Sequence, residues 1–391
     1  MSTAKKKSIL AAIMATACLL LSAAVQAATW TVEKDGSGDF TIIQDALDAA
    51  APGDTLLIGP GRFDEFRVDT LLFNGVTNAA IAWVKTPGLT IIGAGRESTI
   101  IGPASYVGVF EGEDTGSLVI DTGATCEIRD IGIENSRYEV TIIAQTLMED
   151  CRITRSPFRE DHSLFVSHCS GVVIRRLELL NTGGITTLPG VSDLLIEDCQ
   201  ITDDSDWTYG IQLSNSPSNC TVRDCTIVGG GTGIQYSGTG WVDDCALRGQ
   251  RATGLEVVGG GHMVARRCTV GTTRSGLWVS SGRLELYDSV LEGGTRETIA
   301  STGDVYVRNS HILNAGGLSV LGRTHTHIGI IDLRNNWWGT SDPAQVLAWI
   351  DDKYGTVLWE PFNDMPSPTE STSMSELKSQ FRRGGVGGSQ D

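Results

Sequence analysis

Ile196-Glu197-Asp198-Cys199-Gln200-Ile201 decides the fold, because its pattern of apolar, polar, Asp or Asn, Cys, any residue and apolar recurs along most of the chain. With the cysteine as position zero, the equivalent positions are Ile131, Cys151, Leu177, Cys199, Cys225, Cys245, Cys268, Ser289, Ser310 and Asn336. Successive positions lie between 20 residues (131 to 151) and 26 residues (151 to 177) apart. Such a period is typical of solenoids, in which short units stack on one another.

The flanking columns predict the shape of each unit. Positions minus three and plus two are apolar in every copy. Position minus one holds Asp or Asn in eight copies and Arg in two: Asp130, Asp150, Arg176, Asp198, Asp224, Asp244, Arg267, Asp288, Asn309 and Asn335. Asp and Asn tolerate the left-handed backbone of sharp bends. Each unit is therefore predicted to be strand, corner, strand, and stacking joins the apolar columns into one core.

The repeat resembles the right-handed parallel β-helix of the pectin lyase-like superfamily over roughly residues 29 to 363. Residues 35–44 resemble the opening of many such proteins, and residues 335–340 resemble their closing coil. The resemblance implies an all-β fold, a single-stranded right-handed parallel β-helix (solenoid) of about a dozen coils. It does not imply one activity, because the superfamily includes pectate lyases, polygalacturonases, pectin methylesterases, tailspikes and members without known catalysis.

The two ends of the solenoid are predicted to carry caps. Thr41 and Gln44 have the spacing of a capping box at the start of a helix that runs to about Ala50. A second helix is predicted after Asp342-Pro343. We expect Trp337, Trp338, Trp349 and Trp359 to pack in the C-terminal cap, with a sugar-binding platform as the alternative, because terminal repeats must cover the core they end.

Residues 1–27 read as a secretory signal peptide, with Lys5-Lys6-Lys7 before an apolar run and small residues before Ala28. The β-helix domain is expected over 28–363, and the polar tail over 364–391 is expected to be disordered. The mature protein should be secreted, periplasmic or at the cell surface. No other stretch has the length of a membrane span.

The charge of the chain narrows the class of partner. The formal charge is −17 at pH 7, and loss of the three lysines of the signal peptide makes it −20. Nucleic acid and anionic membrane surfaces are therefore poor partners. A polysaccharide or other glycan, neutral or bridged by calcium, fits this charge, and we expect a monomer.

Eight cysteines remain after the signal peptide, and five of them occupy position zero. Parallel coils place neighbours in one column about 4.8 Å apart, longer than the roughly 3.8 Å between the Cβ atoms of a disulfide. We expect these five to be buried, reduced and packed as small apolar residues. Cys126, Cys169 and Cys220 lie outside the column and are the ones that a local movement could pair.

Candidate functional residues lie where coils carry extra length. Two loops, residues 155–162 and 203–209, and Asn181 share one register, so they should cluster on one face. The catalytic candidates are Asp203, Asp204, Asp206, Arg155, Arg159 and His162, and the ligand-binding candidates are Trp207, Tyr209, Asn181 and Asp161. Paired carboxylates could act as acid and base on a glycosidic bond, and arginine could bind uronate. The alternative is a solvated, charged loop.

Metal and family motifs are incomplete. Asp203, Asp204 and Asp206 could hold calcium through oxygen ligands, whereas His325 and His327 lack further ligands and read as surface residues. Asn181-Thr182-Gly183, Asp203-Asp204 and Gly261-His262-Met263 resemble the polygalacturonase set, but its first Asp is missing and Gly261 comes more than two coils after Asp204. The mature lysines, any of which could serve a lyase as base, all lie outside the regular coils: Lys34, Lys85, Lys353 and Lys378.

Three functions remain open on the sequence. The leading hypothesis is an exported protein that binds a polysaccharide or surface glycan along its flank. The second is a polysaccharide lyase or glycoside hydrolase acting on an acidic polysaccharide. The third is a structural or adhesive surface protein without catalysis.

Overall fold

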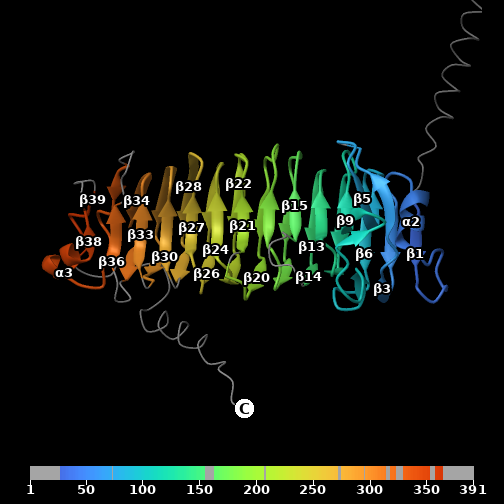
Figure 1. Cartoon of the computed structure of the whole chain (residues 1–391), viewed down its shortest axis with the longest axis horizontal. Coiled ribbons are helices and arrows are strands. Elements are labelled where there is room, and N and C mark those ends of the chain that lie inside the picture. The colour runs from blue at the N-terminus through green and yellow to red at the C-terminus, as the bar shows by residue number, and fades with distance from the viewer. Residues whose placement is uncertain are drawn as a thin grey trace, which may run out of the picture.

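A computed structural model describes residues 27–72, 74–154, 163–206, 208–271, 274–294, 296–313, 318–322, 329–352 and 357–363. The chain winds into an elongated solenoid of about 13 turns, with β1 (Thr29–Val32) and α2 (Ile43–Ala49) at one tip of the long axis and α3 (Pro343–Ala348) and β39 (Val357–Leu358) at the other (Figure 1). The expected signal peptide falls almost wholly outside the described residues, and the polar tail, Arg155, Arg159, Asp161, His162, Trp207, His325 and His327 fall outside them completely.

Each turn contributes strands to three sheets, named here A, B and C. Sheets A and B are parallel throughout, and sheet C is parallel except for β4, which runs antiparallel to β5, and β8, which runs antiparallel to β9. Strands of successive coils are neighbours, so each sheet runs the length of the molecule. The six-residue pattern accounts for A and B, which flank the predicted corner, whereas sheet C lies outside that pattern.

Sheet A is 14-stranded and contains, in spatial order, β1 (Thr29–Val32), β2 (Thr55–Ile58), β6 (Leu89–Gly93), β10 (Cys126–Arg129), β13 (Thr146–Glu149), β16 (Val173–Arg175), β19 (Leu195–Glu197), β22 (Cys220–Arg223), β25 (Thr239–Asp243), β28 (Gly261–Arg266), β31 (Gly282–Tyr287), β34 (Asp304–Arg308), β37 (Ile331–Asp332) and β39 (Val357–Leu358).

Sheet B is 11-stranded and contains β3 (Gly61–Phe63), β7 (Thr99–Ile101), β11 (Gly132–Glu134), β14 (Arg152–Thr154), β17 (Glu178–Leu180), β20 (Gln200–Asp203), β23 (Thr226–Gly229), β26 (Ala246–Arg248), β29 (Thr269–Gly271), β32 (Val290–Glu292) and β35 (His311–Leu313).

Sheet C is 14-stranded and contains β4 (Arg67–Thr70), β5 (Thr77–Val84), β8 (Val109–Phe110), β9 (Glu113–Ile120), β12 (Tyr138–Ile142), β15 (Leu164–Val166), β18 (Ile185–Thr187), β21 (Tyr209–Leu213), β24 (Thr232–Tyr236), β27 (Thr253–Val257), β30 (Ser275–Val279), β33 (Glu297–Ser301), β36 (Leu318–Gly322) and β38 (Ile350–Asp351).

The corner between sheets A and B forms as predicted. All ten residues at position minus one have positive φ, from 49° at Asp288 to 61° at Asn335. Eight are Asp or Asn, for which this conformation is least costly. The two exceptions, Arg176 and Arg267, donate two hydrogen bonds each to the corner aspartate of the preceding coil, Asp150 and Asp244, at 2.6 to 2.8 Å. These bidentate pairs offset the strain of an arginine at such a corner.

The core is built from the columns that the repeat identified. All twenty residues at positions minus three and plus two are at most 1% exposed. Position zero is also buried, and all eight cysteines from Cys126 to Cys268 are free thiols. The Cys199 Sγ lies 3.8 Å from the Ile174 carbonyl oxygen of the coil before it. Burial raises the pKa of both Cys151 and Cys268 to about 12, so these thiols stay protonated.

The N-terminal helix α2 (Ile43–Ala49) buries Ile43, Ala46 and Leu47 in the same core cluster as the sheet residues. The predicted capping box is wrong, because no side chain caps the helix at Ile42. Gln44 instead accepts a bond of 2.7 Å from the Trp83 N–H and donates to the Asp48 carboxylate at 2.7 Å. Gln44 thus ties the helix to β5.

At the other end, α3 (Pro343–Ala348) starts at Asp342, whose side chain accepts a 2.9 Å bond from the Ala344 N–H. Trp338 is fully buried, and Trp349 and Trp359 pack partly buried against the core. These three positions agree with a packing role for the C-terminal tryptophans. Within the described residues, no helix is long and apolar enough to span a membrane.

Candidate functional site

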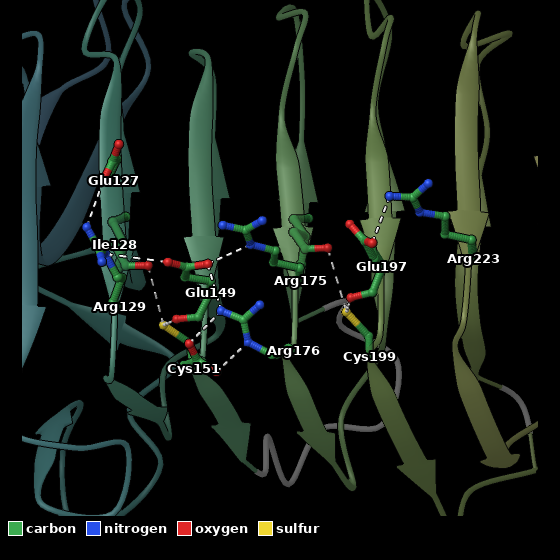
Figure 2. A network of polar contacts seen from close by, with 12 residues as sticks. Glu127, Ile128, Arg129, Glu149, Cys151, Arg175, Arg176, Glu197, Cys199 and Arg223 are labelled. Carbon is green, nitrogen blue, oxygen red and sulfur yellow. Dashed lines mark hydrogen bonds and ion pairs between the residues drawn. The ribbon is translucent and has the colours of Figure 1, made fainter.

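The outer face of sheet A carries two long columns of side chains in register. One column contains Arg129, Glu149, Arg175, Glu197, Arg223, Asp243 and Arg266, each opposite the next across neighbouring strands. The sign of the charge alternates at every step. Because neighbouring strands lie about 4.8 Å apart, each anion of the column lies between two cations. Figure 2 shows five of these rungs, from β10 to β22.

Glu149 is the centre of this column. Its side chain is 7% exposed and accepts hydrogen bonds from Arg175 Nε at 2.6 Å and Arg176 Nη2 at 2.8 Å, with Arg129 Nε 3.5 Å away (Figure 2). Burial alone would raise the pKa of Glu149, but the bonds from the two arginines outweigh burial and hold the pKa below its usual value. Glu149 is therefore an ionised anchor and not a proton donor at neutral pH.

The second column, two residues earlier in each strand, carries several partly exposed apolar side chains. Leu147, Val173 and Leu195 lie opposite one another, followed by Thr221, Trp241 and Val264. At the N-terminal end of this column the surface is hollowed into an open groove of about 530 Å³ over β6, β10, β13 and β16. Its lining mixes the apolar Leu147 and Val173 with polar and charged groups including Thr90, Glu127 and Arg175. Such a mixed lining suits a ligand with both ring faces and hydroxyl groups.

Further along the second column, the sequence Trp241, Val264, Glu285, Tyr306 occupies four successive rungs. Trp241 is 38% exposed, and Tyr306 is half-buried under Arg283, whose guanidinium carbon lies 4.4 Å from the ring centre. Aromatic rings of this kind offer a flat apolar face with a polar rim. The two rings flank a charged rung and could contact different units of one extended ligand.

Glu285 organises the polar groups around it. Its carboxylate accepts the Tyr287 hydroxyl at 2.5 Å and Arg283 Nε at 2.8 Å, and it lies 2.9 Å from His262 Nε2. Burial raises its pKa, but the bonds from Tyr287 and His262 and the charge of Arg283 outweigh burial and lower it. Two rungs of the face are thereby locked together through one ionised carboxylate.

Asp332 is likewise an ionised carboxylate bonded to its neighbours, at the last regular rung. It forms ion pairs with Arg308 and, at 2.7 Å, with Arg334, and its side chain is almost fully buried. Burial opposes ionisation, yet the two arginines lower its pKa to about 2. Glu149, Glu285 and Asp332 thus share one design, an acid held ionised by at least one arginine. The arrangement suits binding better than acid catalysis, which needs a carboxyl with a raised pKa.

The sequence-predicted residues that the structure describes lie elsewhere, at the turn between sheets B and C. Asp203 is buried, and its carboxylate accepts bonds from the Ser205 N–H at 3.0 Å, the Ser205 hydroxyl at 2.8 Å and the Thr208 hydroxyl. The Asp203 carboxylate is therefore bonded within its own loop. Asp206 is exposed and pairs with Arg251 of a later loop.

Asp204 is exposed in the same loop, Tyr209 begins β21 half-buried, and Asn181 is an exposed corner residue with φ of 54°. Asp203, Asp204, Asp206 and Tyr209 belong to one loop and the strands that flank it, and the predicted cluster of this loop with residues 155–162 stays a prediction. The remaining candidates, Arg155, Arg159, Asp161, His162 and Trp207, lie outside the described residues. The catalytic and ligand-binding roles assigned to this cluster stay predictions.

Sequence reasoning missed the outer face of sheet A, although a signal for it exists. Position minus two alternates in sign over seven successive rungs, and position minus four carries Leu147, Val173, Leu195 and Trp241 where a solvated strand would be polar. An outward apolar column on a half-exposed sheet is the informative departure from simple alternation. Those positions were treated as surface because only the inward columns were compared.

Metal binding has no support on either face. Among the described residues, no group of three or more His, Cys, Asp or Glu side chains is arranged to hold a metal ion. The three aspartates considered for calcium point to different partners, since Asp203 is bonded within its loop and Asp206 pairs with Arg251.

Comparison with known proteins agrees with this architecture. Residues 76–240 match the family model described as "Right handed beta helix region". No curated protein matches the sequence.

Several solved structures are similar to the chain in outline. Pectate lyase Pel9A is 10% identical, with 89% of this chain and 82% of that chain covered and a TM-score of 0.43. An alginate lyase from Paenibacillus sp. str. FPU-7 is 15% identical, with 77% and 99% covered and a TM-score of 0.41. The catalytic domain of a GH87 alpha-1,3-glucanase is 12% identical, with 76% and 66% covered and a TM-score of 0.44.

These identities and TM-scores are too low to transfer an activity to this chain. The repeat, its ten corners and the match to the family model identify the fold of the chain but not an activity. The chain folds as a right-handed parallel β-helix, and its residues 76–240 match the family model of that description.

Proposed function

We propose that the protein binds an extended polysaccharide along the outer face of sheet A. The observation that carries this proposal is the second column of that face, in which a groove of mixed apolar and polar lining at one end continues in register to Trp241 and Tyr306. Strand spacing repeats every 4.8 Å or so, which presents a periodic surface to a periodic polymer. The groove is open, so a chain could enter and leave along the solenoid axis.

Both chemical requirements of sugar binding are met on this face. Trp241 offers an exposed ring on which a sugar could stack, and Leu147 and Val173 offer apolar contact in the groove. The ordered carboxylates and arginines between them present acceptors and donors for hydroxyl groups. Because these side chains are already fixed by their mutual bonds, little conformational entropy is lost when a ligand binds.

The experiment is a glycan array on the mature protein, followed by calorimetry on the hits. Trp241→Ala should weaken binding by about tenfold, since an aromatic contact on a desolvated ring contributes on the order of 1.4 kcal/mol. The matched control is Tyr209→Ala, a half-buried aromatic on sheet C in the loop cluster that the sequence singled out. Loss of binding in Tyr209→Ala with none in Trp241→Ala would move the site to the turn between sheets B and C.

The lyase or hydrolase alternative is tested on the same hits by product assay with and without calcium. The ionised state of Glu149, Glu285 and Asp332 favours binding without cleavage on sheet A. Absence of any glycan ligand would favour the structural or adhesive alternative. We further propose that the mature chain acts outside the cytoplasm as a monomer, which cell fractionation and light scattering test.

A further inference from the structure

The arginines on the outer face of sheet A are already paired with acids. Arg175 and Arg176 bond to Glu149, and Arg223 bonds to Glu197 at 2.7 Å. At the other end, Arg283 bonds to Glu285, and both Arg308 and Arg334 bond to Asp332. Arg266 makes no ion pair with any residue that the structure describes, but in the register it lies opposite Asp243. The positive charge of this face is therefore largely neutralised by its own carboxylates.

An incoming carboxylate or sulfate would have to compete with these internal acids. Separating an arginine from a mostly buried partner such as Glu149, 7% exposed, or Asp332, 4% exposed, leaves that partner uncompensated. Such a loss weakens binding strongly, because one charge of the pair remains buried and unpaired. In addition, the formal charge of −17 repels a polyanion over the whole surface.

A sugar hydroxyl can bind without separating an arginine from its acid. A guanidinium has five N–H donors and a carboxylate has about four lone-pair sites, so a paired Arg and Glu still keep free positions for sugar hydroxyls. Glu285 lies opposite Tyr306 and Arg283 stacks on the Tyr306 ring, two strands from Trp241, so a sugar chain that stacks on Trp241 would bring the hydroxyls of a further unit to this pair. An uncharged sugar can thus bind without breaking an ion pair.

From this pairing we infer that the polysaccharide bound on sheet A is a neutral one, and that uronate-bearing and sulfated chains are selected against. The inference rests on the proposed function and narrows its substrate class. The sequence-based expectation that arginine binds uronate concerns Arg155 and Arg159, which lie outside the described residues. The inference concerns the arginines of sheet A, whose acidic partners become visible in the structure.

The test compares neutral polysaccharides (glucans, mannans and galactans) with polygalacturonate and alginate at about 50 and about 500 mM NaCl. A neutral chain should bind at least about tenfold more tightly than either polyuronate, and its Kd should change little with salt. A polyuronate that binds more tightly and weakens steeply with salt would overturn the inference while leaving polysaccharide binding intact. Binding of no polysaccharide at all would instead refute the proposed function and the inference with it.

A charge variant tests the physical reason. Glu285→Gln keeps the shape of the side chain but releases Arg283, so binding of polygalacturonate should rise by about fivefold or more relative to wild type. Glu178→Gln is the matched control, because Glu178 lies between two arginines, Arg96 at 3.7 Å and Arg152 at 3.8 Å, but on sheet B. An equal rise in both variants, or in neither, would contradict selection by the ion pairs of sheet A. Circular dichroism checks that both variants keep the fold.

Discussion

Replacing Glu149 by alanine removes the acid at the centre of the charged column and leaves three arginines facing one another. The carboxylate accepts two short charge-assisted bonds, at 2.6 and 2.8 Å, and each such bond contributes on the order of 1.5 to 3 kcal/mol. The two arginines are 37% and 42% exposed, so water recovers part of that loss. We expect Glu149→Ala to lower the free energy of unfolding by about 2 kcal/mol.

Glu197→Ala is the matched control for this prediction. Glu197 occupies the same column two rungs away, but it is 25% exposed and bonds to one arginine, Arg223, which is 45% exposed. An exposed pair of this kind is worth less than about 1 kcal/mol. The contrast between the two variants therefore isolates burial and the number of arginine partners, because residue type, strand position and the arginines on both sides in the column are alike.

The assay is urea unfolding at pH 7, followed by circular dichroism and tryptophan fluorescence. Both variants should keep the wild-type dependence on urea and differ from wild type only in the midpoint. Equal costs for Glu149→Ala and Glu197→Ala, or a cost below about 0.5 kcal/mol for Glu149→Ala, would refute the reasoning that Glu149 is a buried anchor.

The contribution of Glu149 to the free energy of unfolding depends on pH. The pKa of Glu149 is lower in the folded protein than its unfolded value of about 4.3. Its contribution is therefore fully present above pH 4.3 or so and is lost as the pH falls through the lower, folded pKa. The stability difference between wild type and Glu149→Ala should shrink below about pH 4.

Three further predictions follow from single contacts. Asp332 has a folded pKa of about 2, so it stabilises the protein above its unfolded pKa of about 3.9 and loses this effect as the pH falls towards 2. In Asp332→Asn, the free energy of unfolding should therefore change less with pH over that window than in wild type. An unchanged pH dependence would contradict the assignment. Gly229→Ala should cost about 3 kcal/mol in urea unfolding, because its Cβ would lie 1.9 Å from the Asp203 carbonyl oxygen and its φ is +76°, whereas Gly260→Ala, with φ of +80° and nothing within 4 Å, should cost about 1 kcal/mol. The native mature protein should react slowly with a thiol reagent at pH 8, and all eight cysteines should react after denaturation without reductant; fewer than five reactive thiols would contradict the reduced column.

The fold was readable from the sequence to an unusual depth. The apolar columns around Cys199 and its equivalents predicted twenty core positions, and all of them are buried. The Asp and Asn at position minus one predicted the corners, including those at Arg176 and Arg267, where the residue type alone would have argued against one. Local chemistry sufficed because a solenoid repeats the same few contacts in every coil.

The candidate site was less accessible. Loop length directed attention to Asp203 and Asp206, but an extra residue in a coil says only that the chain leaves the barrel there. In the structure Asp203 accepts hydrogen bonds from Ser205 of its own loop, and Asp206 forms an ion pair with Arg251 from a loop two coils later in the chain. Neither partner could be named from the sequence, because it depends on the direction in which each loop folds over the sheet.

By itself, then, the sequence determined the coil, its corners and its core, because those depend on residue type at a fixed place in a short repeat. Only the tertiary structure decided how the outward side chains meet. The register sets Arg175 between Glu149 and Glu197 and places Trp241 in line with Glu285 and Tyr306. The physical reason is that the repeat aligns the columns, whereas the partner of each outward side chain depends on the direction that it takes across the stacked strands, as where Arg175 and Arg176 both reach Glu149.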